Sequence, residues 1–310
     1  MIPGRAIAAL AGACLLATAA TPACTKRDAP APAPTATPSP APAPLPTPSP
    51  TPIPAPTPPA TSLTAPASRG CAAAAAAPRG TTYETRTGRT FHVWGPSTYD
   101  ANHAYPVVLT FHGWYTNGRD FQKWFKMEEH VEGAAFTVYP DAKGPTWDIV
   151  GNTDLDFTAD VIEAMANAYC IDRTHVFALG FSYGGKLVHH LGCKRPDLVR
   201  AISVGDGSWQ EETGCRSLPV LVTHRTRDDD ERLTWGKDAA RRWAKVDGCA
   251  EPAEEVDAAH GCVAYRACKP PGSVTFCEDK HFDPTWPKDW NHTIREEYRS
   301  LTWSWFTKVP

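Results

Sequence analysis

The sequence has no apolar run long enough to cross a membrane. Its Ala/Leu-rich stretch at residues 6–20 is shorter than the ~20 apolar residues that a spanning helix needs. The formal net charge of −3 over 310 residues shows no basic surplus of the kind that nucleic acids attract. None of the ten cysteines forms a Cys-x-x-Cys pair, the spacing that many zinc sites use. These absences argue against a transmembrane span, against nucleic-acid binding and against a metal site.

The first 23 residues have the organisation of a secretory signal peptide. Arg5 supplies a positive charge, the apolar stretch follows, and Thr21-Pro22-Ala23 ends in a small residue. We therefore expect a secreted, extracellular protein. Cys24 has three interpretations: a lipidated cysteine that anchors the chain to the cell surface, a residue beside an ordinary cleavage site, or a stray thiol. Thr stands at position 21, where a bacterial lipoprotein signal has Leu.

Residues 29–68 carry no charged side chain and consist mainly of Pro, Ala, Thr and Ser. This composition cannot bury a core and is typical of an extended, semi-rigid spacer. We predict a linker over residues 24–68. The remaining residues, 69–310, suit one α/β domain with a full core.

Eight of the ten cysteines fall in this predicted domain, at positions 71, 170, 193, 215, 249, 262, 268 and 277. An even number of cysteines in an exported chain predicts disulfide bonds. Spacing does not determine how they pair.

Segments typical of strands alternate with segments typical of helices along the domain. The predicted strands are 105–111, 135–139, 175–179, 201–204, 219–224 and 273–277, and the predicted helices are 120–131, 155–168, 186–191, 236–246 and a last one from near Thr293, capped by Glu296, towards Lys308. This alternation predicts an α/β fold with a mostly parallel sheet and helices on both faces. Active-site residues of such sheets gather beyond the carboxyl ends of the strands.

The segment Gly180-Phe181-Ser182-Tyr183-Gly184-Gly185 is the most informative part of the chain. It joins a predicted strand to a predicted helix and contains G-x-S-x-G, the nucleophile elbow of α/β-hydrolases. Such a turn strains the serine, so Gly180 and Gly184 avoid a collision with strand and helix. Ser182 is the predicted nucleophile.

A serine nucleophile needs an acid and a base that follow it in the chain order Ser, Asp or Glu, His. Four carboxylates at positions 228–231 come directly after the strand 219–224. We favour Asp228 as the acid, with Asp229 and Asp230 as alternatives. The base should lie near the C-terminus.

Two histidines meet that condition. His292 precedes the final predicted helix, and His281 follows the last predicted strand by four residues. We favour His292 and keep His281 as the alternative, whereas His260, in a loop flanked by cysteines, fits less well.

An oxyanion hole needs two backbone N–H groups. We expect them from Tyr183, the residue after the nucleophile, and from about Trp114, after the strand that ends in His112-Gly113. His112 itself fits a structural turn residue. Aromatic residues on predicted strand-end loops would form an apolar substrate pocket or pack in the core. These aromatic residues are Trp114, Tyr115, Trp147, Tyr183 and Trp209.

The chain resembles the secreted esterases that group feruloyl esterases, acetylxylan esterases and polyhydroxybutyrate depolymerases. The likeness covers nearly all of residues 71–310, and the form of the elbow is similar to that of feruloyl esterases in particular. Further matching segments are Gly88–Pro96, Tyr99-Asp100, Pro106–Gly113, Val138–Asp141, Tyr169–Asp172, Leu191–Asp197, Trp243-Ala244 and Gly248-Cys249.

The resemblance implies an α/β-hydrolase fold, a Ser-Asp-His triad and ester hydrolysis without metal or cofactor. The family's acid stands four residues beyond a strand-end His-Gly, which corresponds to Asp228 counted from His224, although Arg225 replaces that Gly. The family's Gly-His-Thr motif matches Asn291-His292-Thr293 in part, and His281 lies at the better distance from the preceding cysteine.

The expected function is release of ferulic or a related hydroxycinnamic acid from plant cell-wall polysaccharide by a monomeric enzyme. The partner is then a polysaccharide-linked or polymeric ester. Acetylxylan and polyhydroxyalkanoate esters are alternative substrates. Serine peptidase activity is an alternative to ester hydrolysis. An alternative of another class is a non-catalytic surface or carbohydrate-binding protein with a decayed hydrolase domain.

Overall fold

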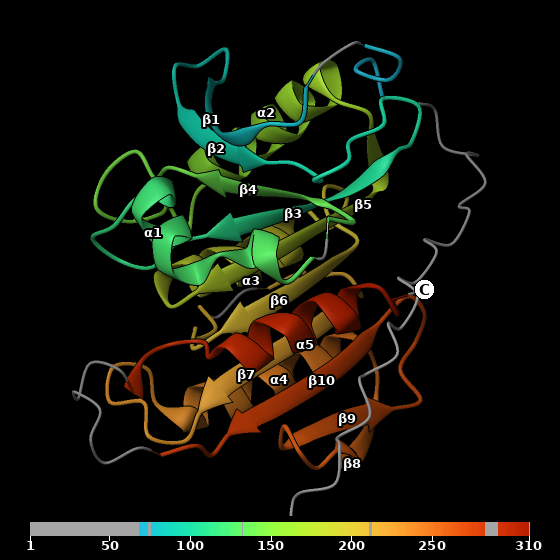
Figure 1. Ribbon diagram of the computed structural model, residues 1–310. Coiled ribbons are helices and arrows are strands. Elements are labelled where there is room, and N and C mark those ends of the chain that lie inside the picture. The colour runs from blue at the N-terminus through green and yellow to red at the C-terminus, as the bar shows by residue number, and fades with distance from the viewer. Residues whose placement is uncertain (1–67, 74–75, 132, 211–212, 283–290, 310) are drawn as a thin grey trace, which may run out of the picture. The chain divides into compact units, whose positions relative to one another are not determined.

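Ten strands form one mixed sheet in the order β1-β2-β4-β3-β5-β6-β7-β10-β9-β8 (Figure 1). The computed structural model describes residues 68–73, 76–131, 133–210, 213–282 and 291–309. The predicted signal peptide, Cys24 and the linker up to residue 67 lie outside the described residues. The strands are β1 (Arg79–Glu84), β2 (Thr90–Trp94), β3 (Tyr105–Phe111), β4 (Phe136–Pro140), β5 (Ile171–Phe181), β6 (Ala201–Gly205), β7 (Pro219–Arg225), β8 (Ala250–Asp257), β9 (Cys262–Arg266) and β10 (Ser273–Asp279).

The central strands, from β4 through β3, β5, β6 and β7 to β10, pair in parallel. Antiparallel strands complete the sheet at both edges. All residues of β6 and β7 are buried, as expected for continuous apolar strands covered on both faces. The predicted α/β fold with a mostly parallel sheet is confirmed.

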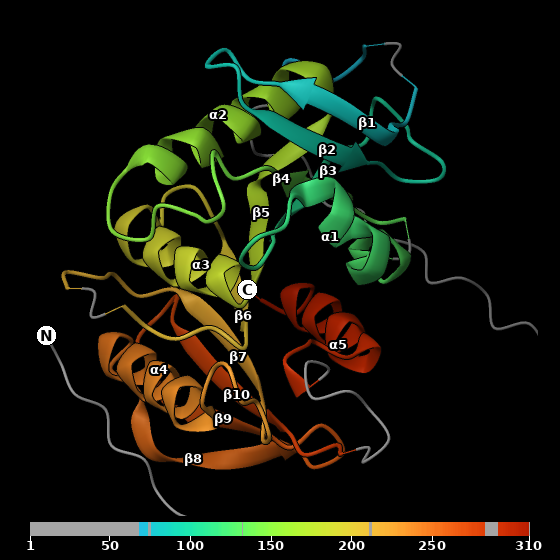
Figure 2. The ribbon, with the colours of Figure 1, turned by 90° about the vertical axis from the view of Figure 1, so that its left-hand side faces the viewer.

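Helices cover both faces of the sheet. Helices α2 (Thr153–Ala168), α3 (Tyr183–Lys194) and α4 (Leu233–Val246) lie on one face, and α1 (Gly118–Phe125) and α5 (Glu296–Phe306) lie on the other (Figure 2). Each face has its own apolar core cluster. Because helices enclose the sheet, the strand ends and the loops beyond them are the places where polar side chains converge.

Three local features differ from the sequence-based expectation. Helix α1 ends at Phe125 rather than at residue 131, because Lys126 takes a left-handed conformation (φ 46°) and a short 3₁₀ turn, Met127–Glu129, follows. Helix α5 begins at Glu296, with an extended Arg295 as its N-cap and no side-chain cap. The edge strands β8 and β9 are unexpected from sequence, since β8 is rich in charged residues and exposed along much of its length.

All eight domain cysteines are paired in disulfides: Cys71–Cys170, Cys193–Cys215, Cys249–Cys268 and Cys262–Cys277. The expectation of a disulfide-bonded domain is confirmed. The first bond spans 99 positions of the sequence and ties the start of the domain to β5, whereas the third spans 19.

The longest-range disulfide should contribute most to stability. Replacing Cys71 and Cys170 together with Ala is expected to lower the free energy of unfolding by about 2–5 kcal/mol, because the unfolded chain regains the entropy of a long closed loop. The matched pair Cys249→Ala/Cys268→Ala should cost about 1.5 kcal/mol less on loop length alone. Denaturant unfolding of both variants checks this, and an equal or reversed order would contradict it.

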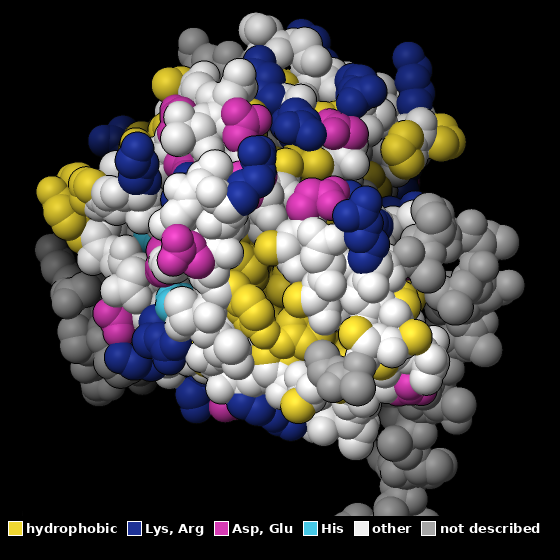
Figure 3. Space-filling view, turned by 90° about the horizontal axis from the view of Figure 1, so that it is seen from above, with side chains coloured by type: hydrophobic (Ala, Val, Ile, Leu, Met, Phe, Trp, Pro, Cys, Tyr) yellow, Lys and Arg dark blue, Asp and Glu magenta, His cyan; other side chains and the backbone are white. Residues whose placement is uncertain are grey.

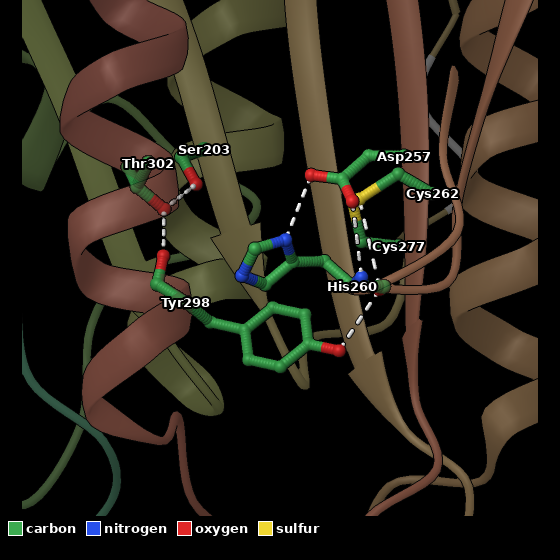
Figure 4. The surroundings of a disulfide bond; sticks show 7 residues. All are labelled: Ser203, Asp257, His260, Cys262, Cys277, Tyr298 and Thr302. Atoms are coloured by element: carbon green, nitrogen blue, oxygen red, sulfur yellow. Dashed lines mark hydrogen bonds and ion pairs between the residues drawn. A yellow bond between two sulfur atoms is a disulfide. The ribbon is translucent and has the colours of Figure 1, made fainter.

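The Cys262–Cys277 bond joins directly opposite residues of β9 and β10. Figure 4 shows Tyr298 of α5 beside it, donating its hydroxyl hydrogen to the carbonyl of His260 (2.9 Å). The His260 ring in turn pairs with Asp257 (Nδ1–Oδ2 2.7 Å). His260 therefore belongs to a structural contact at the sheet edge.

On the face shown in Figure 3, acidic and basic side chains are interspersed rather than grouped by sign. This fits the small net charge of −3 and offers no single-sign surface there for a polyanion. Among the described residues, no helix has the length and apolar character needed to cross a membrane.

Candidate active site

Ser182 lies in the turn between β5 and α3, with φ 55° and ψ −119°. A non-glycine residue in this region carries strain of about 1–3 kcal/mol, which the surrounding structure must hold. A Cβ on Gly180 would lie 2.2 Å from the carbonyl oxygen of Gly184, and one on Gly184 would lie 2.3 Å from that of Phe111. The two glycines thus let strand and helix meet closely enough to present the serine at the turn.

The structure brings Ser182, His292 and Asp228 together, in the order expected for a nucleophile, base and acid. Nε2 of His292 lies 2.7 Å from Oγ of Ser182. On the other side of the ring, Nδ1 lies 2.7 Å from Oδ2 of Asp228. The Asp228 side chain is fully buried and that of His292 is 14% exposed, so the pair is shielded while the serine end stays reachable.

Asp228 is fixed by the backbone of its own loop. Its Oδ1 accepts hydrogen bonds from the amides of Asp230 (2.9 Å) and Glu231 (2.8 Å). Asp229 and Asp230, the alternative acids, are both exposed. Only one carboxylate of this acidic run, Asp228, bonds to His292 among the described contacts.

His281, the alternative base, is exposed at the end of β10. Its carbonyl accepts a hydrogen bond from Arg225 (3.1 Å), and its side chain lines a cavity that His292 also lines. The ring that accepts the hydrogen bond of the Ser182 hydroxyl is that of His292.

The electrostatics of the site favour a charged imidazole. Burial lowers the pKa of His292, but the hydrogen bond and negative charge of Asp228 outweigh that effect, so the net pKa lies above the usual 6.5. The Asp228 bond also requires a proton on Nδ1, which leaves Nε2 of the neutral ring free to accept the serine proton.

A second carboxylate, Asp206, lies beside this pair and was not expected from sequence. It follows β6 with φ 48°, is 1% exposed, and its Oδ1 accepts the amide hydrogen of Arg225 (2.9 Å). Burial, and then the charge of Asp228, raise the pKa of Asp206 well above its usual value, which favours its neutral form. The only sequence signal is its position at a strand end.

Asp206, Asp228 and His292 each present a possible metal-ligand atom, and these atoms lie within 4.8 Å of one another. Their hydrogen bonds already explain this proximity. Nδ1 of His292 and Oδ2 of Asp228 bind each other, and Oδ1 of Asp206 is bound to a backbone amide.

Two backbone amides near Ser182 are candidate donors for an oxyanion. A Cβ on Gly113 would lie 3.4 Å from Cβ of Ser182, so the loop after β3 runs directly past the serine. Within the described residues, no hydrogen bond occupies the amides of Trp114 or Tyr183. These are the two donors expected from sequence.

His112, at the end of β3, has a supporting position. Its Nδ1 lies 2.7 Å from the carbonyl oxygen of Gly113, and its Nε2 accepts from the amide of Ala142 (3.3 Å). Burial lowers the pKa of His112 despite the backbone hydrogen bond, so the neutral ring links two strand-end loops, as expected for a structural turn residue.

The predicted aromatic pocket is only partly assembled. Trp114 and Tyr115 are 59% and 74% exposed beside the serine loop, where a substrate can reach them. Trp147 instead lies in the core, 3% exposed, because its indole N–H donates to the carbonyl of His112 (2.8 Å). Trp209 packs against Trp243 on the α4 side (ring centroids 5.0 Å).

A different cavity adjoins His292. It has a volume of about 610 Å³ and lies between α1 and α5. Trp124 and Phe181 line it, with their rings edge to face at 5.6 Å. Trp124 was not among the predicted pocket residues, because its segment was predicted to be a helix and not a strand-end loop.

Comparisons with known proteins agree with the fold. Residues 106–215 match the family described as alpha/beta hydrolase fold. The chain is 29% identical over 173 residues to a probable feruloyl esterase C of Aspergillus clavatus, a match of 52% of this chain and 62% of that protein. It is 28% identical over 151 residues to a bifunctional acetylxylan esterase/xylanase of Neocallimastix patriciarum, covering 47% of this chain and 22% of that protein.

Among solved structures, the acetyl xylan esterase from Aspergillus awamori has a similar fold, with a TM-score of 0.55 at 14% identity over 73% of this chain and 98% of that one. The chain has the α/β-hydrolase fold and is distantly related to feruloyl and acetylxylan esterases. It spans only 62% of the first of these relatives.

Proposed function

We propose that the protein is a serine carboxylic-ester hydrolase with Ser182 as nucleophile, His292 as base and Asp228 as orienting acid. The observation that carries this proposal is the continuous pair of 2.7 Å contacts from Ser182 through His292 to Asp228. The same contacts weigh against a decayed, non-catalytic domain, because Arg225 has not displaced the acid from the histidine.

The reaction proceeds in two acyl-transfer steps. Oγ of Ser182 attacks the ester carbonyl carbon while its proton passes to Nε2 of His292, and the amides of Trp114 and Tyr183 donate to the oxyanion, each worth about 3 kcal/mol. The carbon–oxygen bond to the alcohol then breaks as His292 returns the proton to the leaving oxygen. Water attacks the acyl-serine by the same route and releases the acid. These steps require only the chain's own residues and water.

The preferred substrate is a hydroxycinnamoyl ester on plant polysaccharide. The aromatic side chains around the site support this choice, namely exposed Trp114 and Tyr115 beside the serine and Trp124 with Phe181 beside the histidine. The feruloyl esterase among the relatives adds to it. The acetylxylan esterase relative makes an acetyl ester the second candidate.

We further propose that residues 1–23 direct export and 24–68 form a spacer before the 69–310 catalytic domain. Four disulfides support an oxidising extracellular location. Mass spectrometry of the mature N-terminus checks the cleavage site and shows whether Cys24 carries lipid.

Hydrolysis assays distinguish the substrates. The oxidised protein is given methyl ferulate, p-nitrophenyl acetate and a short polyhydroxybutyrate oligomer, with Ser182→Ala as the control. Ferulate turnover that is absent from the variant is the expected result. Turnover of acetate alone would reassign the substrate to small acyl esters, and no serine-dependent turnover of any of the three would contradict the proposed function.

The acid is tested by Asp228→Asn, with Asp229→Asn and Asp230→Asn as matched controls. We expect kcat for p-nitrophenyl acetate to fall by about 10⁴-fold in the first variant and to stay close to wild type in the others, whose carboxylates are exposed.

The pH profile gives a second readout of the same variant. Because the pKa of His292 is raised above 6.5 and the neutral ring is the base, wild-type kcat/KM should fall as pH drops through a midpoint above 6.5. This midpoint should move to lower pH in Asp228→Asn, where the stabilising charge is lost. An unchanged midpoint would contradict the assignment.

A further inference from the structure

The two ends of the segment that carries His292 are held by one buried carboxylate, that of Asp279. This segment runs from the end of β10 at Asp279 to the start of α5 at Glu296. Asp279 is 3% exposed, and its side chain accepts hydrogen bonds from one residue near each end of the segment. Two of these three hydrogen bonds come from a guanidinium group, and hydrogen bonds between charged groups are stronger than those between neutral ones.

At the near end, Oδ1 of Asp279 accepts the amide hydrogen of His281 (3.0 Å). At the far end, Arg295 forms a fork on the same carboxylate, with Nε 2.7 Å from Oδ2 and Nη2 2.8 Å from Oδ1. Arg295 is only three residues beyond His292, so this contact limits where the imidazole can lie.

The same strand end also holds the acid. The carbonyl of Asp279 accepts the amide hydrogen of Thr226 (2.9 Å), two residues before Asp228. Arg225, paired in register with Asp279, donates from its guanidinium to the carbonyl of His281 (3.1 Å). The loop of the acid and the segment of the base are therefore tied to one point.

Close packing also fixes the described end of the segment, residues 291–296, from a second side. A Cβ on Gly205 of β6 would lie 2.0 Å from Cδ1 of Ile294, so Ile294 packs directly on the bare backbone of the strand. Between Asp206, Asp279, Ile294 and Arg295 a cavity of only about 10 Å³ remains. Ile294 and Arg295, two and three residues beyond His292, are therefore closely packed against the sheet.

We propose that Asp279 and Arg295 are positioning residues for His292, forming a clamp that sets the imidazole between Asp228 and Ser182. The clamp acts on the imidazole through geometry, and Arg295 also lines the cavity beside His292. The proposal rests on the proposed function for its kinetic consequence, because a displaced base lowers the rate of the acyl-transfer steps and leaves substrate binding nearly intact.

The test uses two variants of opposite charge, Asp279→Asn and Arg295→Gln, made in the full chain. Loss of the clamp weakens the His292–Asp228 bond in both, so the pKa of His292 should fall in both. A direct charge effect would instead lower this pKa when the anion is removed and raise it when the cation is removed. NMR titration of the His292 ring, assigned with His292→Gln, measures the pKa without any substrate.

Kinetics give the second readout. We expect kcat for p-nitrophenyl acetate to fall by about 10- to 100-fold in both variants, as for a base misplaced by about 1 Å, with KM nearly unchanged. Arg295→Lys keeps the charge but loses the two-pronged hydrogen bond to Asp279. Its kcat should lie between the kcat of these two variants and that of the wild type. Glu254→Gln removes the exposed pair between Glu254 and Arg266 (3.1 Å) and is the control that should change nothing.

Opposite shifts of the His292 pKa in Asp279→Asn and Arg295→Gln would overturn the proposal, as would wild-type kcat in both. Arg295→Lys carries the same test if one of the other variants does not fold, because its charge is unchanged and any fall in the pKa reports geometry alone. If the wild type turned over no ester, the proposed function would fail, and the NMR titration would still decide for or against the clamp.

Discussion

Replacing Ser182 with Ala should reduce kcat/KM for p-nitrophenyl acetate by about 10⁶-fold, because the nucleophile is removed and the remaining triad cannot act alone. The residual rate should still exceed that of water by about 10³–10⁴-fold, through the oxyanion amides and substrate binding. The fold should persist, since alanine at φ 55° carries the same backbone strain as serine and loses only one hydroxyl group.

The matched control for this variant is Ser300→Ala, an exposed serine on α5 that should retain full activity. Thermal melts of both variants separate loss of chemistry from loss of structure. Wild-type turnover by folded Ser182→Ala would remove Ser182 from the mechanism.

His292→Ala should cause a loss of similar size, about 10⁶-fold in kcat, because the base and the nucleophile act as a unit. His281→Ala is the control from the same segment and should keep kcat close to wild type, since its ring is exposed and the serine bonds to His292. Steady-state kinetics on p-nitrophenyl acetate measure both variants. A large loss of kcat in His281→Ala with a near-wild-type kcat in His292→Ala would assign the base to His281.

Adding imidazole to the two variants refines this test. A free imidazole that enters the space left by His292 should restore part of the rate of His292→Ala, in proportion to its concentration. No such response is expected from His281→Ala. Rescue of His281→Ala alone would contradict the geometry described for His292.

The sharp turn at Ser182, the proposed nucleophile, was predictable because its requirements are local. A strand, a sharp turn and a helix fall within one short segment, and the close approach at Gly180 and Gly184 explains why that turn demands glycine. The parallel sheet was predictable for a related reason, since strands such as β6 and β7 are buried on both faces and read as continuous apolar runs.

The proposed acid and base could only be narrowed to a few residues from the sequence. Asp228 differs from Asp229 in burial and in the amides that its carboxylate accepts, and these depend on how the loop after β7 turns. The His292 ring bonds to Ser182, which lies 110 positions away in the sequence, and the proposed clamp of Asp279 and Arg295 holds it there. A pattern of residue types carries no information on such long-range contacts.

Trp147 and Asp206 also show that sequence patterns do not reveal tertiary contacts. Trp147 was predicted at the site and lies in the core, whereas Asp206 lies beside the site and was not predicted there. Trp147 lies in a loop whose sequence suggests a pocket wall, but the carbonyl of His112 draws its indole into the core. Asp206 has no motif around it, and only the meeting of β6 and β7 places it beside Asp228. In both cases tertiary packing decides the side chain's surroundings.

The most direct test of the central claim, that Ser182 is an activated nucleophile, is the reaction of the folded chain with a fluorophosphonate. The probe attaches covalently to serines that have an adjacent base. Peptide mass spectrometry should find the adduct on Ser182 in the wild type and none in Ser182→Ala, with labelling strongly slowed in His292→Ala. An unlabelled wild type, or an adduct that persists in Ser182→Ala, would contradict the account.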